Sequence, residues 1–333
     1  MLHRFSKLVV GCTILLILAG SLVTSHRAGL SVPDWPTSYG WNMFTFPPSM
    51  WVANILYEHG HRLIASAVGF LTILLVAWLW MADTPRWLRW FGVAALGAVI
   101  TQGLLGGLTV VFFLPPPIST AHAALAEIFL CMTVSIALFT SPSWSAQSDP
   151  IDDGRLRRVA RVTAAFVYCQ ILVGATMRHT GAGAAIPDFP WMFGHVVPDH
   201  WSTHIAIHFA HRVGALIVAT SAVSTAVYVR RWYPDRSELA SPALLLILLV
   251  VVQITLGASV VVSGLQPWIN SVHVVVGALV LATSLVISLR SWQVRFPARV
   301  PPNARCPCTH TMRSAFPSGC AGVTFDSDAV RSR

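Results

Sequence analysis

The sequence predicts an all-α, polytopic membrane protein with eight transmembrane helices, arranged as two pseudo-symmetric four-helix bundles. Three observations support this fold class. Of the 333 residues, 55% are hydrophobic and only 11% are charged, whereas about 25% of the residues in a soluble domain are charged. Apolar stretches of roughly 18 to 25 residues recur along the chain, and such lengths cross a bilayer as helices. Finally, a set of histidine motifs in the first half returns in the same order in the second half.

The first half contains four apolar stretches that we expect to span the membrane, at residues 8–24, 54–81, 90–113 and 118–140. A short basic segment precedes the first of them. No clear small-x-small cleavage site follows it, which favours a retained span over a cleaved signal peptide. The prolines at 115–117 end the third span, since proline breaks a helix interior. Residues 1–140 are therefore predicted to form the first four-helix half.

The second half repeats this plan, with predicted spans at residues 162–177, 203–229, 242–263 and 267–289. A polar, arginine-containing segment at 141–161 is predicted to be a cytoplasmic linker between the halves. Residues 162–289 then form the second four-helix half. Residues 290–333 are predicted to be a cytoplasmic tail, and their polar composition is typical of disorder.

Most lysine and arginine residues lie on one side of the predicted spans, and the alternate loops carry only Arg27 and Arg178. Because cytoplasmic loops are enriched in these residues, we expect both termini in the cytoplasm and the long loops at 25–53 and 178–202 outside. The net charge of +9 therefore reflects topology. No basic patch interleaved with aromatic residues is present, so nucleic-acid binding is not expected. The predicted location is a bacterial cytoplasmic (inner) membrane, with the chain crossing the lipid bilayer many times.

Four histidines are repeated between the halves, each in an apolar stretch. They are His61 and His122 in the first half and His211 and His273 in the second. The first members of the pairs are 150 residues apart (61 to 211), and the second members are 151 apart (122 to 273). All four lie in early turns of even-numbered spans, which begin on the outer side. Their imidazoles should therefore lie at a similar depth.

Two imidazoles at one depth on neighbouring helices can bind one metal ion from both sides. Haem iron with two axial histidines fits this arrangement, because helix bundles build cofactor sites between facing helices. Nearby glycines, among them Gly106 and Gly257, would let a flat ring approach closely. Zinc is less favoured, since no cysteine or second carboxylate completes a tetrahedral set at this depth. A single membrane histidine could simply form an interhelical hydrogen bond, but four paired across a repeat favour haem.

An arginine follows one histidine of each pair, Arg62 after His61 and Arg212 after His211. A guanidinium binds carboxylates well, and a haem carries two propionates. Arginine side chains near a membrane surface also reach out to lipid phosphates. The sequence leaves both partners open.

The halves differ three residues before the first histidine, where Glu58 stands in one half and His208 in the other. Residues three apart share a helix face, so Glu58 should face the same cavity as His61. A partly buried carboxyl group there can transfer a proton or stabilise positive charge that develops on a substrate. The alternative is an ion pair with Arg62 or Arg27 in the interfacial region.

The long loops also repeat, with Pro-Asp-aromatic-Pro stretches at residues 33–36 and 187–190. Their aspartates, Asp34 and Asp188, are expected to form turns rather than to act in catalysis, since this side chain bonds readily to nearby backbone groups. Matching features in one order indicate an internal duplication.

The chain resembles the haem A synthase family (CtaA type) over about residues 8–289. The resemblance rests on Ala-Gly-Leu-Ser-Val-Pro-Asp-Trp-Pro at 28–36, Glu58-x-x-His61-Arg62, His122, Arg-His-Thr-Gly-Ala-Gly at 178–183, Pro-Asp-Phe-Pro at 187–190, His208-x-x-His211-Arg212 and His273. Together these motifs are specific, although the histidine motifs alone are not. The chain departs from the family in its first outer loop, which lacks the cysteine pair of some members. In addition, Thr24 stands where the second half has Arg178.

The resemblance implies a membrane oxidoreductase that oxidises a methyl group of haem O to the formyl group of haem A, for use by cytochrome oxidase. It implies that the first half holds the substrate haem. His61 and His122 would be axial ligands of its iron, and Arg62 would be a further haem contact. Glu58 would be the catalytic residue at the reacting edge of the ring.

For the second half, the resemblance implies a haem b cofactor. His211 and His273 would be the axial iron ligands, and Arg212 a further haem contact. This haem would pass on electrons from a membrane electron donor. Haem O synthase, cytochrome oxidase assembly factors and a second copy of the chain are further partners consistent with the resemblance.

Two other functions share the four histidines. A non-catalytic di-haem b membrane cytochrome would transfer electrons from quinol and would give Glu58 no necessary role. A haem carrier or transporter would need one pair to bind weakly and open a path across the bilayer, yet all four histidines lie towards one side. Replacement of Glu58 distinguishes the enzyme from the cytochrome.

Overall fold

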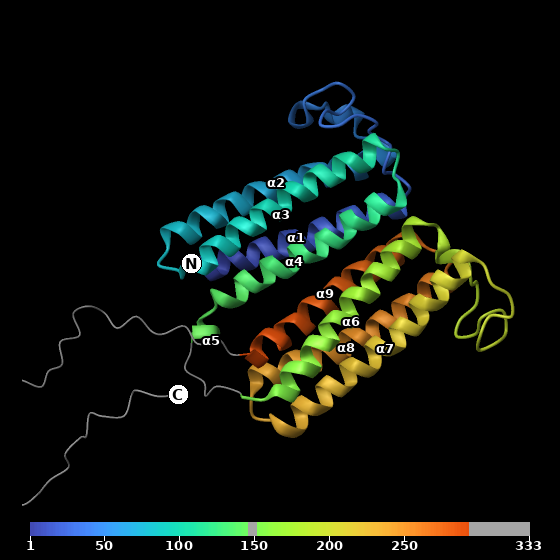
Figure 1. Cartoon of the computed structure of the whole chain (residues 1–333). Helices are drawn as coiled ribbons and strands as arrows, with labels where there is room; N and C mark the ends of the chain where they lie inside the picture. Colours follow the sequence, from blue (N-terminus) through green and yellow to red (C-terminus); the bar gives the residue numbers. More distant parts are fainter. Residues whose placement is uncertain (146–151, 293–333) are drawn as a thin grey trace, which may run out of the picture. The chain divides into compact units, whose positions relative to one another are not determined.

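The structure is a computed structural model that describes residues 1–145 and 152–292 of the chain. The predicted tail beyond residue 292, and its three cysteines, lie outside the described residues. So does part of the predicted linker, residues 146–151. The described residues belong to one compact unit, and its long segments are all helical (Figure 1).

Eight long helices carry the fold. They are α1 (Leu2–Ser25), α2 (Ala53–Met81), α3 (Arg86–Val111), α4 (Pro116–Phe139), α6 (Gly154–His179), α7 (Thr203–Trp232), α8 (Ser237–Val262) and α9 (Pro267–Trp292). Each is long and apolar enough to cross a membrane, which confirms the predicted all-α, eight-span fold. The short elements are η1 (Met43–Thr45), η2 (Pro48–Met50), α5 (Pro142–Ser145) and η3 (Ala182–Ala184).

Several helices begin earlier than the apolar stretches predicted. The first starts at Leu2 rather than at residue 8, and α6 starts at Gly154, inside the predicted linker. At α6 the cause is a side-chain cap, because the Asp153 carboxylate accepts hydrogen bonds from the backbone N–H of Arg155 (2.8 Å) and Leu156 (3.0 Å). Aspartate at this position satisfies helix N–H groups that otherwise lack partners. Charged residues can therefore continue a membrane helix beyond its apolar part.

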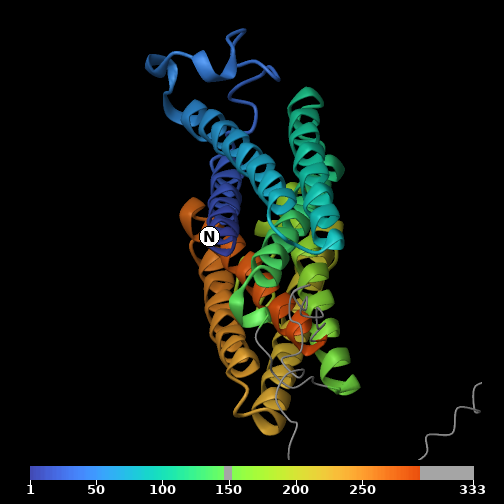
Figure 2. The ribbon, with the colours of Figure 1, turned by 90° about the vertical axis from the view of Figure 1, so that its left-hand side faces the viewer.

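The two long loops lie at the same end of the helices, which we call the loop side (Figure 1). The first loop extends beyond the ends of α1 and α2 (Figure 2). The α3–α4 and α8–α9 turns lie on this side too, because each helix reverses direction. The pseudo-two-fold relation between the halves stays a prediction.

The halves meet through helices α1 and α4 of the first and α6 and α9 of the second. Both α1 and α4 pack against α9, and α4 also packs against α6. In α4 and α9, 44% and 56% of the most apolar 18-residue stretch is buried, whereas in the other long helices 17 to 28% of this stretch is buried. The two central helices, α4 and α9, each carry one of the repeated histidines, and the other six leave much of their surface to the lipid.

Candidate functional site

The four repeated histidines occupy matching positions in their helices. His61 and His211 each lie eight residues after the first residue of α2 and α7, and His122 and His273 lie six residues after the first residue of α4 and α9. At 1.5 Å per residue, they lie roughly 9 to 12 Å inside the loop-side ends of these helices. All four are half-buried. The rings thus lie at one level on the loop side.

Each histidine ring lies edge-on against a glycine of the preceding helix. The distances from the place that a glycine Cβ would take to the ring Cε1 are 2.9 Å for Gly20–His61, 3.1 Å for Gly106–His122, 2.9 Å for Gly174–His211 and 3.1 Å for Gly257–His273. Real Cβ atoms essentially never come within 3.0 Å of a neighbour and rarely come within 3.4 Å, so a larger residue would push the ring away. We call these four the ring-facing glycines.

The sequence analysis named two of the ring-facing glycines, Gly106 and Gly257, and missed Gly20 and Gly174. The missed pair is 154 residues apart (20 to 174), which is also the spacing of the Pro-Asp-aromatic-Pro stretches. A search of the first predicted span for residues repeated at this spacing could have identified both glycines.

The second-half pair has the separation that a shared metal ion requires. The ring centroids of His211 and His273 are 6.4 Å apart, with 67° between the ring planes. Metal–imidazole bonds of about 2.0–2.1 Å put two rings on opposite sides of one metal with centroids roughly 6 Å apart. In the first half, His61 and His122 lie close enough to interact electrostatically.

Three of the four rings also have an unsatisfied nitrogen. The buried Nδ1 atoms of His61, His122 and His273 have no hydrogen-bond partner among the described residues. A buried polar atom without a partner is unusual in a native protein and points to a missing ligand or water. Within the described residues, no three His, Cys, Asp or Glu side chains gather as a metal site. A pair of histidines suits an iron whose other ligands come from a porphyrin, so haem fits these residues.

Glutamine side chains contact three of the histidines. Gln102 donates through Nε2 to the backbone carbonyl of His122 at 2.8 Å. Gln253 lies with its Nε2 atom 3.4 Å from Nε2 of His273. In the second half, Gln170 of α6 lies with its Nε2 atom 3.0 Å from Nδ1 of His211. The sequence analysis gave these glutamines no role, because a contact between separate helices leaves no local signal.

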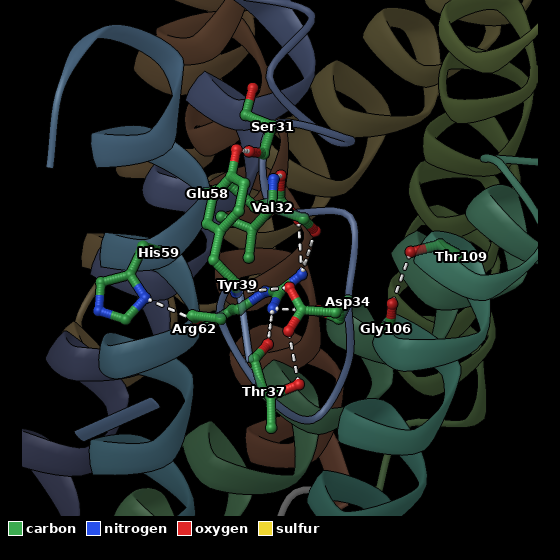
Figure 3. A network of polar contacts seen from close by, with 11 residues as sticks. Ser31, Val32, Asp34, Thr37, Tyr39, Glu58, His59, Arg62, Gly106 and Thr109 are labelled. Carbon is green, nitrogen blue, oxygen red and sulfur yellow. Dashed lines mark hydrogen bonds and ion pairs between the residues drawn. The ribbon is translucent and has the colours of Figure 1, made fainter. Parts of the chain in front are cut away.

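Arg62 holds the first outer loop against α2 (Figure 3). Its guanidinium donates to the backbone carbonyls of Val32 (2.9 Å), Asp34 (2.8 Å) and Thr37 (2.9 Å). It also donates to the Glu58 carboxylate at 2.8 Å. The sequence analysis considered a haem propionate or a lipid phosphate as the partner, and in the structure the loop backbone takes these donors.

Arg212 does the same in the second half. It donates to the carbonyls of Ile186 (3.2 Å), Asp188 (2.7 Å) and Trp191 (2.9 Å). Each of these residues lies 154 positions after its counterpart in the first loop. Both loops are therefore fixed by the arginine that follows a repeated histidine.

Glu58 and His208 hold the same backbone group of the two loops. Glu58 is buried and 3% exposed, and its Oε2 accepts from the N–H of Val32 at 2.8 Å. His208 is 2% exposed, and its Nδ1 accepts from the N–H of Ile186 at 3.3 Å. The halves thus share this contact but differ in its charge. The ion pair with Arg62 that the sequence analysis considered is present.

Asp34 and Asp188 form turns, as predicted. Asp34 accepts hydrogen bonds from the N–H of Gly40 at 2.8 Å and from the N–H of Tyr39 at 2.7 Å. Asp188 accepts hydrogen bonds from the N–H of Gly194 at 2.8 Å and from the N–H of Phe193 at 2.8 Å. Burial alone would raise the pKa of Asp34, but these hydrogen bonds outweigh it and lower the pKa. The Gly194 N–H likewise lowers the pKa of Asp188, so both aspartates are charged and fixed near neutral pH.

Arg178 joins the two halves on the loop side. Its Nη1 donates to the Ser21 hydroxyl at 2.9 Å, and its Nη2 donates to the Ser21 carbonyl and the Ser25 hydroxyl at 2.6 Å each. Ser25 in turn contacts the Ser271 hydroxyl of α9 at 2.9 Å. Thr24 lies beside these serines and bonds within its own helix, to the carbonyl of Gly20. One half-buried arginine therefore ties α6 to α1, without a counterpart at residue 24.

Comparison with known proteins supports the family resemblance. A sequence model of a family described as cytochrome oxidase assembly protein (COX15-CtaA) matches residues 3–285. Several similar proteins bear the name heme A synthase. That of Halalkalibacterium halodurans is 26% identical over 85% of this chain and 95% of its own length. That of Shouchella clausii is 28% identical over 75% and 83%, and that of Shewanella oneidensis 27% identical over 84% and 93%.

Proposed function

The chain belongs to the COX15-CtaA family of cytochrome oxidase assembly proteins, and we propose that it is a haem A synthase, a membrane oxidoreductase that converts haem O to haem A. The proteins it resembles over most of their length carry that name. The observation that carries the proposal is the set of four histidine rings at one level, each against a glycine of the preceding helix. This geometry suits two flat haems between helices, one per half.

In the second half, His211 and His273 would hold the iron of haem b. Their 6.4 Å centroid separation supports this assignment. When bound, this haem supplies electron transfer to the first half. Arg212 fixes the outer loop beside the ligand helix and keeps positive charge at the loop side, where a haem carboxylate would be favoured.

In the first half, His61 and His122 would bind the iron of the substrate haem O and of the product haem A. Arg62 holds the loop backbone, as Arg212 does in the other half. Glu58 is assigned the catalytic role, since it places a buried carboxylate on the same helix, one turn from His61. It would take up or give a proton at Oε1 or Oε2 beside the reacting group.

The protein is a multi-pass membrane protein. We place it in a bacterial cytoplasmic membrane with both termini in the cytoplasm, because most of the lysine and arginine residues that the structure describes lie opposite the loop side. The two haem sites then lie towards the outer face of the membrane. The partners are haem O and a membrane electron donor, with haem O synthase, oxidase assembly factors or a second copy of the chain as further candidates.

The test is to extract and identify the haems made by the protein. The chain is expressed in a bacterial membrane that produces haem O but no haem A, and the extracted haems are separated by chromatography and identified by mass. Haem A or a hydroxylated precursor is expected, and a His61→Ala variant expressed to the same level is the control. Folded, haem-loaded protein that yields only haem B and unmodified haem O would contradict the proposal.

One observation favours the second candidate, a non-catalytic di-haem b cytochrome. The Glu58 carboxylate is engaged by the Val32 N–H and by Arg62, which is a structural role of its own. Glu58→Gln separates the two functions, because glutamine keeps the size of the side chain and one acceptor oxygen but cannot take up a proton as a carboxylate does. An enzyme loses conversion in this variant, whereas a cytochrome keeps its haem spectrum and its electron transfer.

A further inference from the structure

A carboxyl group that has no role in the proposed function lies inside the membrane-spanning part of α4. Glu127 is 4% exposed and follows His122 by five residues, which places it roughly 7.5 Å farther from the loop side at 1.5 Å per residue. Its Oε2 atom has no hydrogen-bond partner among the described residues. An ionisable side chain at this depth is costly and is a candidate for proton transfer.

Glu127 faces the second half of the protein. Its electrostatic neighbours are Cys131, one turn farther along α4, and Tyr168 of α6. The Tyr168 hydroxyl donates to the backbone carbonyl of Ala124 at 3.4 Å, which fixes this side chain against α4. Both Cys131 and Tyr168 also pack against the apolar core of the second half. The carboxyl group therefore lies at the contact between α4 and α6, one helix from each half.

No charged side chain compensates an ionised Glu127. The long helices packed against α4 are α1, α3, α6 and α9. Between the level of the repeated histidines and their opposite ends, these helices contain no acidic or basic residue, and the short α5 contains none either. The titratable side chains in these stretches are two thiols and one phenol, those of Cys12, Cys169 and Tyr168. A carboxylate in such surroundings is costly unless a positive charge comes near it.

The second half has no counterpart of this carboxyl group. The spacing of 151 residues that relates His122 to His273 places Ala278 at the position of Glu127. Ala278 is fully buried, with 0% of its surface exposed. Glu127 is therefore a feature of the first half alone, the half in which the substrate haem is proposed to bind.

We propose that Glu127 is a proton-binding residue that takes up one proton when an electron reaches the first-half haem and releases it when the electron leaves. The inference rests on the proposed function, in which each half holds a haem. An oxidised haem between two neutral histidines has one positive charge at its centre, from iron(III) and a doubly negative ring. A carboxylate on the same helix is stabilised by that charge.

Reduction to iron(II) removes the positive charge and leaves the carboxylate uncompensated. Glu127 then binds a proton from the aqueous phase and becomes a neutral carboxylic acid. One electron, from the membrane electron donor, and one proton arrive together, and the only covalent bond formed is the O–H bond of Glu127. The interior of the protein thus gains no net charge when the electron crosses from one half to the other.

The test is a redox titration of the purified holoprotein at several pH values, followed by haem absorbance. The midpoint potential of the first-half haem should fall as the pH rises. Coupling to one proton changes the equilibrium constant by at most tenfold per pH unit, which is about 59 mV for one electron. The first-half haem is identified by its loss in His61→Ala. The second-half haem should show no part of this dependence that Glu127 variants remove.

Substitutions at residue 127 assign the proton. Glu127→Gln keeps the size of the side chain but cannot bind a proton as a carboxylate does, so the pH dependence should be lost. Glu127→Ala, which copies Ala278 of the second half, should lose it too, whereas Glu127→Asp should keep it. The matched controls are the two electrostatic neighbours, since Tyr168→Phe and Cys131→Ala should leave the dependence unchanged.

Infrared difference spectra detect the proton itself and do not depend on turnover. On reduction, the unmodified protein should gain a carbonyl-stretching band of a protonated carboxyl group, and this band should shift in D₂O. Glu127→Gln should lack the band. If that variant does not assemble, Glu127→Asp decides the assignment, because it should move the band without removing it.

The outcomes separate the two proposals. If the folded, unmodified protein carries no haem at the His61–His122 pair, the proposed function fails. If it carries haem there, but the potential does not change with pH or changes equally in Glu127→Gln, this inference is overturned while the function stands. A dependence that is lost in Tyr168→Phe but kept in Glu127→Gln would also overturn it, because the proton would then be bound elsewhere.

Discussion

The two halves hold their repeated histidines in the same way and differ in the residues beside them. In each half a ring-facing glycine meets each histidine, and an arginine holds the outer loop by its carbonyls. Beside the first histidine of each pair they differ in Glu58 against His208, and in Leu16 against Gln170, each four residues before a ring-facing glycine. In the proposed function, each histidine pair thus has a separate task that its neighbours determine, while the histidines themselves are the same.

The ligands should give the largest effects and show whether the sites are independent. His61→Ala is expected to abolish conversion of haem O while haem B stays bound, because the second pair is untouched. His211→Ala is expected to lose haem B and conversion together, since electrons no longer reach the first half. Haem content per protein, measured after extraction, checks both. Loss of haem B in His61→Ala would show that the halves are not separate sites.

Glu58 tests the difference in charge. Glu58→Gln is expected to lower conversion by about 10²- to 10⁴-fold, the usual contribution of a general acid or base. Glu58→His, which copies the second half, should assemble with its loop in place and be equally inactive. The rate of haem A formation is the measurement, and the haem B spectrum is the control. Full activity in Glu58→His would remove Glu58 from catalysis.

Substitution of the ring-facing glycines tests the glycine–histidine packing that the two halves share. Gly20→Ala should weaken haem binding in the first half only, and Gly174→Ala in the second half only, because the added methyl displaces the ring. Such overpacking costs about 1–3 kcal/mol, which corresponds to roughly 5- to 150-fold in affinity. Gly11→Ala, on the same helix as Gly20, is the matched control, since a Cβ there meets nothing within 4 Å. Equal haem loss in all three variants would indicate a general loss of stability instead.

The smallest effects are expected in the loops. The pKa of Asp34 lies below its ordinary value of 3.8, so its carboxylate stabilises the loop above that pH and stops doing so as the pH falls through the lowered pKa. The first loop should therefore keep its protection from hydrogen exchange between pH 8 and about 5 and lose it only below about 4. Asp34→Asn should reduce protection of the first loop by a few-fold at pH 7, and Asp188→Asn that of the second. A loss that crosses from one loop to the other would mean that they are coupled.

Much of the fold followed from the sequence, because a bilayer imposes a length and a composition on each span. The helix starts did not, since caps such as Asp153 extend α6 beyond its apolar part. The four histidines were found through the repeat. The partners of Arg62 were not, because backbone carbonyls have no sequence signature. Gln170 was missed for a related reason, as its contact with α7 exists only once the helices pack.

The direct packing of α4 on α9 has a consequence for the path of an electron. These two central helices carry His122 and His273, one histidine from each pair. In the proposed enzyme, a tunnelling route between the two irons therefore runs through covalent bonds and side-chain contacts of the protein interior. No lipid tail has to take part in it. The transfer rate should then be the same in thick or thin, saturated or unsaturated bilayers, as long as the fold is intact.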